Sequence, residues 1–438
     1  MAKLTAGAAQ IDITPGLGAH LCGYFNDRRA RDILDPLHAK AIVLSDGDTT
    51  LGLVICDLIV VPGDVVDRAK ALITEHTGVP AHNVLIAGTH THTGPAVRSA
   101  LGTPKEEGYD RWLAPRIADA FSMALARLEP AQFAHAAGAC PGEVHNRRWR
   151  MKDGSVRMNP GHLNPEAIEP AGPTDPQLGL IVLRSPQGRP IGAMGNLSLH
   201  YVGVAGDGCV ICADYFAAFG RALNRCAGVQ FVCPLANGTF GDVNNCDFSR
   251  PARTNPAPTF QIERVANVVA GEAWRIWNGL REDDFSDEVQ LGASLARVPF
   301  EARCPSAEEL AAARALYEGG EQWDDMEWIY ARELVLCAEA PSEWTVPIHT
   351  LRIGDLGIVG LPGEVFSQIG LDIKAGSPFS QTMNIGIAND TVGYVATDRA
   401  LDEGSYETRL CRHVRAPRGT GPRWTEAALE GLSKLAER

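Results

Sequence analysis

Runs of apolar and β-branched residues alternate in this sequence with segments whose apolar residues recur every three or four positions. The first pattern is typical of strands buried on both faces, and the second is typical of helices with one buried side. We expect strands at 41–44, 51–61 and 84–87, and helices at 66–77 and 111–128. This order of elements predicts an α/β fold, with mixed, mostly buried β-sheets flanked by helices.

The rest of the chain continues this alternation with one interruption. Residues 138–177 are rich in Gly, Pro, Asn and Arg, and we expect a long functional loop there. Ser306 and Glu309 form a capping box that marks the start of a helix. No internal repeat or low-complexity linker is detectable, so we expect one domain over residues 1–438. Further strands are expected at 180–183, 191–199, 229–233, 346–353 and 356–361, and further helices at 215–225, 262–277, 306–317 and 425–438.

Composition narrows the class of protein. The chain has 438 residues, of which 45% are hydrophobic, and this is enough for a large core. Its formal net charge of −13, without a long Lys/Arg run, argues against nucleic-acid binding. No run approaches the ~20 apolar residues of a membrane span, and the N-terminus lacks the apolar stretch of a signal peptide. The eleven cysteines form no framework of repeated short spacings, so we expect reduced thiols in a cytoplasmic protein.

A polar segment follows the expected strand at 84–87. The sequence from Gly88 to Pro95 reads GTHTHTGP and contains His90 and His92. Side chains two residues apart point to the same face of a strand, so both imidazoles can reach one point at the end of the strand. Neutral imidazole is a common zinc ligand. The pattern therefore predicts a metal-binding or catalytic role for the pair, and the plain alternative is an ordinary polar loop.

Two further candidates follow other expected strands. His200 comes directly after the strand at 191–199, and Glu364 follows a Pro-Gly turn after the strand at 356–361. Two histidines and one glutamate are the protein ligands of many catalytic zinc sites, which keep one position open for water. We therefore expect a metal site at the carboxyl ends of strands. Asp214, just before a helix, is either a helix cap or a part of the site.

Several short motifs occur in the order found in one enzyme family. They are ITPG near the N-terminus, GTHTHTGP at 88–95, Asn146-Arg147, His200, NGTFGDV at 237–243, PGE at 362–364, GYVAT at 393–397 and YE at 406–407. This set resembles the catalytic domain of the neutral/alkaline (non-lysosomal) ceramidases, and its pieces span nearly the whole chain. The extra C-terminal β-sandwich of those enzymes is expected to be absent, because the chain is too short for it.

The resemblance implies a role for each matching residue. It implies four ligands for one zinc ion per chain: His90, His200, Glu364 and Tyr394. It further implies that His92 assists the chemistry beside the metal, that Arg147 binds substrate, and that Tyr406 contacts the reacting carbonyl.

One departure from the family pattern concerns the nucleophile. Ceramidases carry a serine after Gly-Asp-Val, whereas this chain reads Gly241-Asp242-Val243-Asn244. The Asn244 amide is not a nucleophile, so a covalent serine mechanism at this position is excluded. We expect Asn244 to hold substrate or an oxyanion through its amide, with a turn-forming asparagine as the alternative. Asp242 is expected to support substrate binding by orienting the loop or a ligand histidine.

These expectations favour a zinc-dependent hydrolase. A zinc-polarised water would attack an amide carbonyl, while Arg147, His92 and Tyr406 stabilise the oxyanion and protonate the leaving group. A lactonase or esterase acting on a small polar substrate is one alternative. Others are an amidohydrolase barrel, whose His-x-His pair lies on the first strand, and a non-catalytic binding protein that retains the fold. The expected partner is a small-molecule substrate, and a homo-oligomer is compatible with the sequence.

Overall fold

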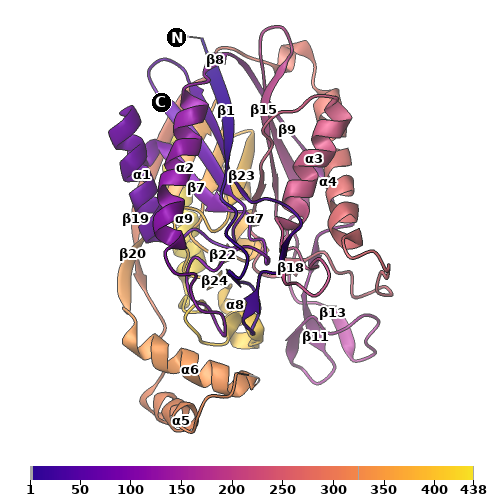
Figure 1. The fold of residues 1–438 in the computed structure, drawn as a ribbon, viewed down its shortest axis with the longest axis vertical. Coiled ribbons are helices and arrows are strands. Elements are labelled where there is room, and N and C mark those ends of the chain that lie inside the picture. Colours follow the sequence, from indigo (N-terminus) through magenta and orange to yellow (C-terminus); the bar gives the residue numbers. More distant parts are fainter. Residues whose placement is uncertain (1–2, 324, 438) are drawn as a thin grey trace.

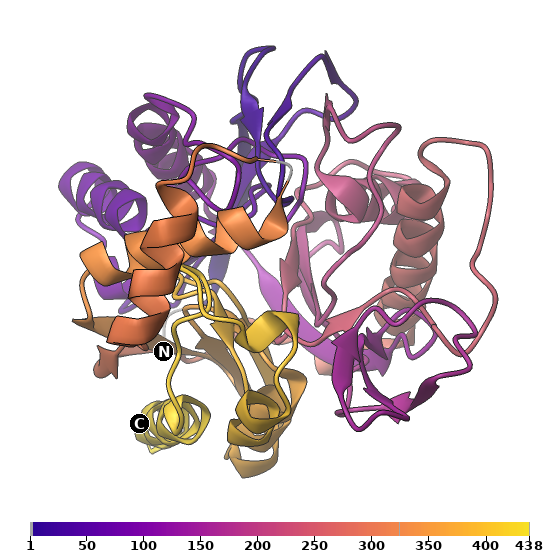
Figure 2. The same cartoon turned by 90° about the horizontal axis from the view of Figure 1, so that it is seen from below.

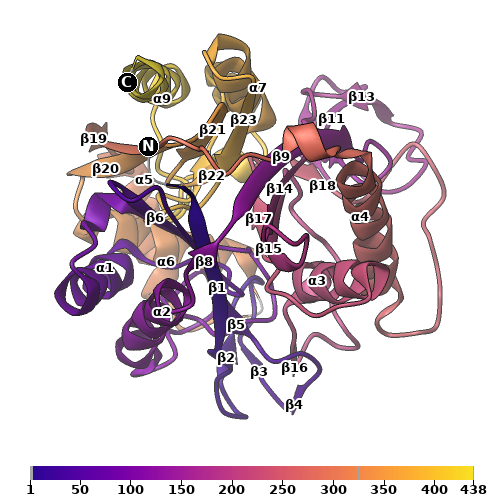
Figure 3. The ribbon, with the colours of Figure 1, turned by 90° about the horizontal axis from the view of Figure 1, so that it is seen from above.

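Three larger β-sheets and the helices outside them make up most of the molecule. The computed structural model describes residues 3–323 and 325–437. The three sheets stand around a common centre, and a pair of helices covers the outer side of each (Figures 1 and 3). The α/β class with mixed, mostly buried sheets flanked by helices is confirmed.

One order of elements occurs three times along the chain. In each unit, three strands that pair antiparallel, each with the next, are followed by a helix, then by a strand parallel to the third, and then by a second helix. Further short elements lie between these members of each unit. The first unit consists of β1 (Thr5–Asp12), β5 (His38–Ser45), β6 (Thr50–Cys56), α1 (Gly63–Thr77), β7 (Val84–Gly88) and α2 (Tyr109–Leu125). The second unit consists of β9 (Gln132–Ala139), β14 (Gln177–Arg184), β15 (Pro190–Leu197), α3 (Asp214–Ala227), β17 (Leu235–Asn237) and α4 (Phe260–Gly279). The third unit consists of β19 (Leu291–Glu301), β20 (Glu343–Ile353), β21 (Leu356–Gly360), α7 (Ser367–Gly376), β23 (Gln381–Ile385) and α9 (Thr420–Ala436). Because the last two strands of each unit are parallel, the loops at their carboxyl ends lie at the same edge of each sheet.

Burial on both faces explains the unbroken apolar sequence of the strands. Along β6, Leu53 and Ile55 face a core that all three sheets share, whereas Val54 faces the core under α1 and α2. The shared core also takes Met194 from β15 and Ile358 from β21. Strands with two buried faces lose the alternation of polar and apolar residues, so their apolar runs are continuous.

The region expected to be one long loop contains short strands. They are β10 (His145–Asn146), β11 (Arg148–Met151), β12 (Val156–Met158) and β13 (Ala167–Pro170), and the last three form a small sheet. The prediction of a loop throughout 138–177 was therefore wrong. These strands are rich in charged and polar residues, and pairing satisfies their backbone groups without the apolar pattern that marks a core strand.

Two of the expected strands are not observed as expected: one ends early, and the other is not a strand. The run at 51–61 leaves the strand after Cys56, and its last residues form a loop in which Ile59 and Val60 line a cavity. Residues 229–233 are not a strand, because their pairing is limited to an isolated bridge between Val232 and Gly192. An apolar run thus marks burial in both places, without marking strand structure.

The expected helices are confirmed, with changes at their ends. The capping box of Ser306 and Glu309 starts α5 (Ala307–Tyr317). The helix expected at 425–438 begins earlier, at Thr420, and Arg438 lies outside the described residues. The other short elements are β2 (His20–Leu21), β3 (Arg28–Arg29), β4 (Asp32–Ile33), β8 (Glu129–Pro130), β16 (Val210–Ile211), β18 (Val243–Asn244), β22 (Glu364–Val365), β24 (Tyr394–Val395), α6 (Met326–Glu339) and α8 (Asp398–Glu403). Among the helices of residues 3–323 and 325–437, none combines the length and the apolar character needed to cross a bilayer.

A buried lysine on α1 makes stability depend on pH. Lys70 is 6% exposed, and no carboxylate of the described residues lies within ion-pair distance of it. Burial lowers its pKa from the ordinary 10.5 to about 7, against a weaker opposing effect of Asp67. The unfolded chain therefore binds more protons than the folded protein between about pH 7 and pH 10.5, and the stability of the folded protein rises with pH through that window.

Replacing this lysine with methionine is expected to stabilise the protein near neutral pH. Lys70→Met removes the cost of charging a buried amine, and we expect a gain of up to about 4 kcal/mol at pH 7, since a pKa lowered from 10.5 to about 7 corresponds to about 1.4 kcal/mol for each pH unit. The gain should fall toward zero by about pH 10. Urea denaturation at several pH values measures it. The matched control is Lys434→Met on the exposed side of α9, which should show no such pH dependence; an equal response of the two variants contradicts the prediction.

Candidate metal centre and active site

Loops from all three units meet at one edge of the molecule. His90 follows β7, His200 follows β15 and Glu364 follows β21. Glu364 begins β22, which pairs in parallel with β24 so that Glu364 lies opposite Tyr394. The topology thus brings together residues that are up to 304 positions apart in the chain, and this confirms that the candidate residues gather at the carboxyl ends of strands.

His90 is held in a strained backbone conformation. β7 ends at Gly88, so neither histidine of the GTHTHTGP segment lies on the strand, and the same-face argument from strand geometry does not apply. The φ angle of His90 is 74°, in the left-handed region that non-glycine residues rarely occupy. Its backbone N–H donates to Leu58, and its ring Nδ1 donates to the carbonyl of Ile59 at 2.9 Å. The bond to Ile59 leaves the lone pair of Nε2 free, and strain of this kind clusters at functional sites.

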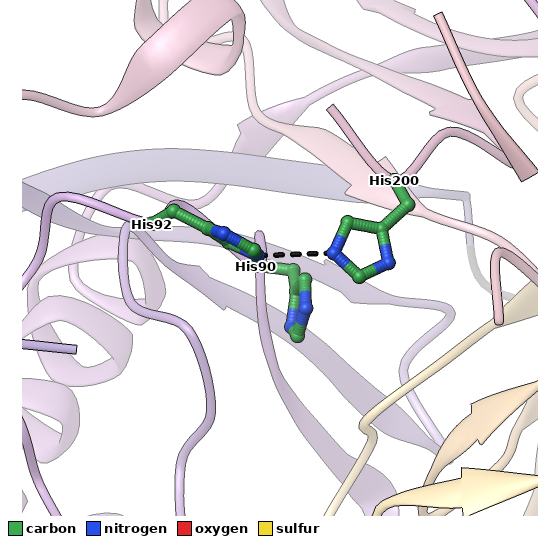
Figure 4. A group of neighbouring side chains, drawn as sticks. All are labelled: His90, His92 and His200. Carbon is green, nitrogen blue, oxygen red and sulfur yellow. Dashed lines mark hydrogen bonds between the residues drawn. The ribbon is translucent and has the colours of Figure 1, made fainter. Parts of the chain in front are cut away.

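The three histidine rings converge (Figure 4). One nitrogen from each of His90, His92 and His200 can be chosen so that all three lie within 4.8 Å of one another, and the Nε2 atoms of His92 and His200 are 3.0 Å apart. Burial lowers the pKa of His90 and lowers those of His92 and His200 far below the ordinary value. All three rings are therefore neutral at physiological pH, which is the form that binds metal ions.

Glu364 supplies a carboxylate oxygen without a hydrogen bond. Its Oε2 lies 3.4 Å from Nε2 of His90 and 3.8 Å from Nδ1 of His200. The residue is 7% exposed, and Oε2 has no hydrogen-bond donor in the described part of the chain. A buried carboxylate oxygen costs free energy unless a donor or a cation satisfies it. Beside neutral imidazoles, this oxygen fits a divalent cation such as zinc, which takes nitrogen and oxygen ligands.

Arg147 connects the other parts of the site. Its guanidinium donates to the hydroxyl of Tyr394 and to Nδ1 of His200, each at 3.1 Å. It also donates from Nε to Glu407 at 2.9 Å and from Nη2 to the carbonyl of Gly241 at 2.9 Å. Burial disfavours the charge of Arg147, but Tyr394 and Glu407 outweigh it and raise the pKa above the ordinary value. The expected substrate contact of Arg147 stays a prediction, and the observed contacts are with protein groups.

A small cavity lies against these groups. Its volume is about 70 Å³, and Tyr406 lines it with its ring 5.7 Å from that of Tyr394. The lining residues include His90, His92, His200, Glu364, Tyr394 and Tyr406 on one part of the wall, and Cys22, Tyr24, Val60, Arg98, Leu101 and His413 on the rest. The imidazoles, the Glu364 carboxylate and both phenols therefore border one shared space.

Asp242 and Asn244 are buried among other protein groups. One carboxylate oxygen of Asp242 accepts hydrogen bonds from the backbone N–H and the hydroxyl of Ser367, and the other accepts one from Asn146. Burial raises the pKa of Asp242. The Asn244 amide donates to Asn159 and accepts from the backbone of Cys246, both at 2.9 Å. The substrate contact expected of Asn244 stays a prediction, and the contacts of Asp242 fix the loop that presents Arg147.

Asp214 has a part in the site that the sequence left open. Its carboxylate accepts from the hydroxyl of Thr91 at 2.8 Å, from the backbone N–H of His92 at 2.9 Å and from the hydroxyl of Thr93 at 3.3 Å. It is 1% exposed, and burial raises its pKa to about 6. Asp214 therefore fixes the segment that carries His92. The only sequence signal was an acidic residue before an apolar helix.

The whole chain is similar in fold to solved neutral ceramidases. The crystal structure of neutral ceramidase from Pseudomonas aeruginosa superposes with a TM-score of 0.74 and 20% sequence identity, covering 100% of this chain and 75% of that one. A structure described as ceramidase complexed with C2 gives a TM-score of 0.76 at 19% identity, with 100% of this chain and 76% of that chain covered. These matches define the fold.

A relative found by sequence similarity is also a neutral ceramidase. The neutral ceramidase of Mycobacterium tuberculosis (strain ATCC 25618 / H37Rv) is 23% identical to this chain, over 92% of this chain and 73% of its own length. A search of protein-family models finds no match. The resemblance to neutral ceramidases that the motifs indicated is confirmed by the sequence and the fold together.

Proposed function

We propose that this protein is a metal-dependent hydrolase that cleaves the amide bond of a small or N-acylated substrate. One observation carries the proposal: the unpartnered Oε2 of Glu364 lies beside the free Nε2 of a neutral His90, in a cavity that substrate can enter. The ligand types favour zinc, with one ion per chain held by His90, His200, Glu364 and Tyr394. Similarity to proteins named neutral ceramidases supports an N-acyl amide as the class of substrate.

A divalent cation at this position supplies Lewis acidity: it lowers the pKa of water and polarises a carbonyl oxygen. The residues of the chain then hold and orient the reactants. Arg147 fixes the Tyr394 hydroxyl through a hydrogen bond and lies beside the His200 ring, and Asp214 fixes the backbone of His92. Reactive groups held in place in this way need little rearrangement during the reaction.

We assign proton transfer to His92 and stabilisation of the oxyanion to Tyr406. Both line the cavity and are half-buried. The neutral imidazole of His92 can take a proton from the attacking water and return it to the amine nitrogen as the C–N bond breaks. The Tyr406 phenol keeps its proton, because burial raises its pKa well above the ordinary value, so it can donate a hydrogen bond to the developing oxyanion. Water is consumed, and a carboxylic acid and an amine are formed.

Matched substrates distinguish this proposal from its alternatives. Purified protein loaded with zinc is assayed on N-acyl amides, and on esters and lactones with the same acyl groups. We expect turnover of amides, with loss of activity on removal of the metal by a chelator. Turnover confined to esters or lactones contradicts the amidase proposal and favours a lactonase or esterase. Binding of the compounds without any turnover favours a non-catalytic binding protein.

A further inference from the structure

Arg98 lines the cavity with most of its hydrogen-bonding capacity unused. A guanidinium has five N–H donors. In the described part of the chain, the side chain of Arg98 makes one hydrogen bond, from Nη1 to the carbonyl of Thr391 at 3.3 Å, and no carboxylate lies within ion-pair distance. Arg98 is half-buried. Within residues 3–323 and 325–437, its other side-chain nitrogen atoms are neither hydrogen-bonded nor closed off from solvent. Its free donors are therefore open to a ligand in the cavity.

The other guanidinium groups near the cavity are occupied. Arg28 donates to three backbone carbonyls, including that of His92. Arg147 is held by the contacts described above, and Arg412 pairs with the buried carboxylate of Glu333 at 2.7 Å. Arg98 is thus the guanidinium of the cavity wall that has donors left for an anion.

The charge of Asp390 attracts Arg98, but Asp390 forms no ion pair or hydrogen bond with Arg98 in the described part of the chain. Oδ1 of Asp390 accepts hydrogen bonds from the backbone N–H groups of Gly63 and Thr391, at 3.0 and 2.7 Å. Burial lowers the pKa of Arg98, and the attraction of Asp390 offsets this only in part. A buried guanidinium without a partner costs free energy, and a bound anion recovers it.

The loop that carries Arg98 is fixed from outside by α6. Leu101 packs against Trp328 and Ile329, and the carbonyl of Leu101 accepts a hydrogen bond from Arg332 at 3.2 Å. The α5–α6 pair lies on the lower side of the molecule, which Figure 2 shows from below. A rigid support of this kind lowers the entropy cost of holding a ligand.

The cavity limits the size of what Arg98 can hold. A volume of about 70 Å³ has room for a few water molecules or a small polar group. Building on the amidase proposed above, we infer that Arg98 binds a carboxylate on the substrate, and that the substrate class is a small N-acyl amide bearing a carboxylate, such as an N-acylamino acid. The guanidinium forms a two-point contact with this carboxylate and so orients the amide toward the imidazoles.

Two substrates that differ only in charge test this inference. N-acetylglycine carries a carboxylate where N-acetylglycinamide carries a neutral amide. For the zinc-loaded protein, we expect kcat/KM to favour N-acetylglycine by at least about tenfold, because a hydrogen bond to a charged group contributes more than one to a neutral group. Arg98→Gln should lower kcat/KM for N-acetylglycine about 10- to 100-fold and leave that for N-acetylglycinamide within about twofold. The matched control, Arg111→Gln on the exposed side of α2, should change neither.

Three outcomes contradict the role of Arg98. They are a wild-type preference for the neutral compound, an equal loss on both compounds in Arg98→Gln, and full activity of Arg98→Gln on N-acetylglycine. Arg98→Lys keeps the charge without the planar fork, and it should retain part of the preference even if Arg98→Gln folds poorly.

A binding measurement separates this inference from the amidase proposal. If the zinc-loaded protein cleaves neither compound, the amidase proposal fails and calorimetric binding decides the role of Arg98. Tighter binding of N-acetylglycine than of N-acetylglycinamide, lost in Arg98→Gln, supports the carboxylate site. Equal binding of N-acetylglycine by the wild type and Arg98→Gln overturns it.

Discussion

Replacing Arg147 with methionine is expected to lower the free energy of unfolding by about 3–5 kcal/mol, the usual cost of removing one partner from a buried ion pair. The guanidinium is 3% exposed, and the carboxylate of Glu407 that it meets at 2.9 Å is fully buried. Without Arg147, the ion-pair partner that remains to Glu407 in the described part of the chain is Arg148, and the Tyr394 hydroxyl loses the donor described above. Urea denaturation of the metal-free protein measures the change without any contribution from bound metal.

The double variant Arg147→Met with Glu407→Gln tests the charge network around Glu407. It also removes the carboxylate that pairs with the buried Arg148 at 2.9 Å and leaves Arg148 with Glu403 at 3.6 Å, so it should not recover the stability lost in Arg147→Met. It should not recover turnover, because Tyr394 and His200 still lack the group that orients them. A loss below about 1 kcal/mol in Arg147→Met means that the pair is not a buried charge pair of the expected strength.

His90→Ala and His92→Ala are expected to fail in different ways. His90→Ala removes a proposed ligand, so it should lose zinc and turnover together. His92→Ala should keep zinc and lose turnover by about 10²- to 10⁴-fold, the usual contribution of a positioned acid or base. Zinc analysis after dialysis and the amide assay give the two readouts.

A second substitution controls for the strained backbone at this position. Alanine at φ 74° is disfavoured, whereas asparagine tolerates the left-handed region, so His90→Asn should lose zinc while keeping the backbone. Loss of zinc in His92→Ala as well contradicts the division of roles, and it indicates a site of three imidazoles, which the geometry of His90, His92 and His200 also allows.

The sequence predicted the layers of the fold better than their threefold organisation. Strands such as β6 and β21 are buried on both faces, and their apolar runs were visible for that reason. The second unit was not recognised, because β17 has three residues, too few for any periodicity, and β9 was not predicted as a strand. The repeat lies in the order and direction of strands, which is set by long-range pairing and leaves no mark on local sequence.

The site residues likewise divide into those that a local sequence pattern indicated and those that it did not. His90, His200 and Glu364 follow apolar strands, so a local pattern was enough to propose them. Tyr394 and Arg147 come from β24 and from the segment between β10 and β11, where no local pattern marks them, and only the resemblance to a family proposed them. The role proposed for Arg98 rests on its lack of an ion-pair partner in the described part of the chain. This lack is visible only in the three-dimensional structure.

The most direct test of the account is the zinc content of the wild type and of Glu364→Gln after loading and dialysis. The glutamine keeps the shape of the side chain and removes the negative charge that has no hydrogen-bond donor at Oε2. We expect one tightly bound zinc ion per chain in the wild type, and a large loss of zinc in Glu364→Gln with an unchanged fold by circular dichroism. A wild type that retains no zinc, or a Glu364→Gln variant that retains as much as the wild type, would contradict the proposed metal site.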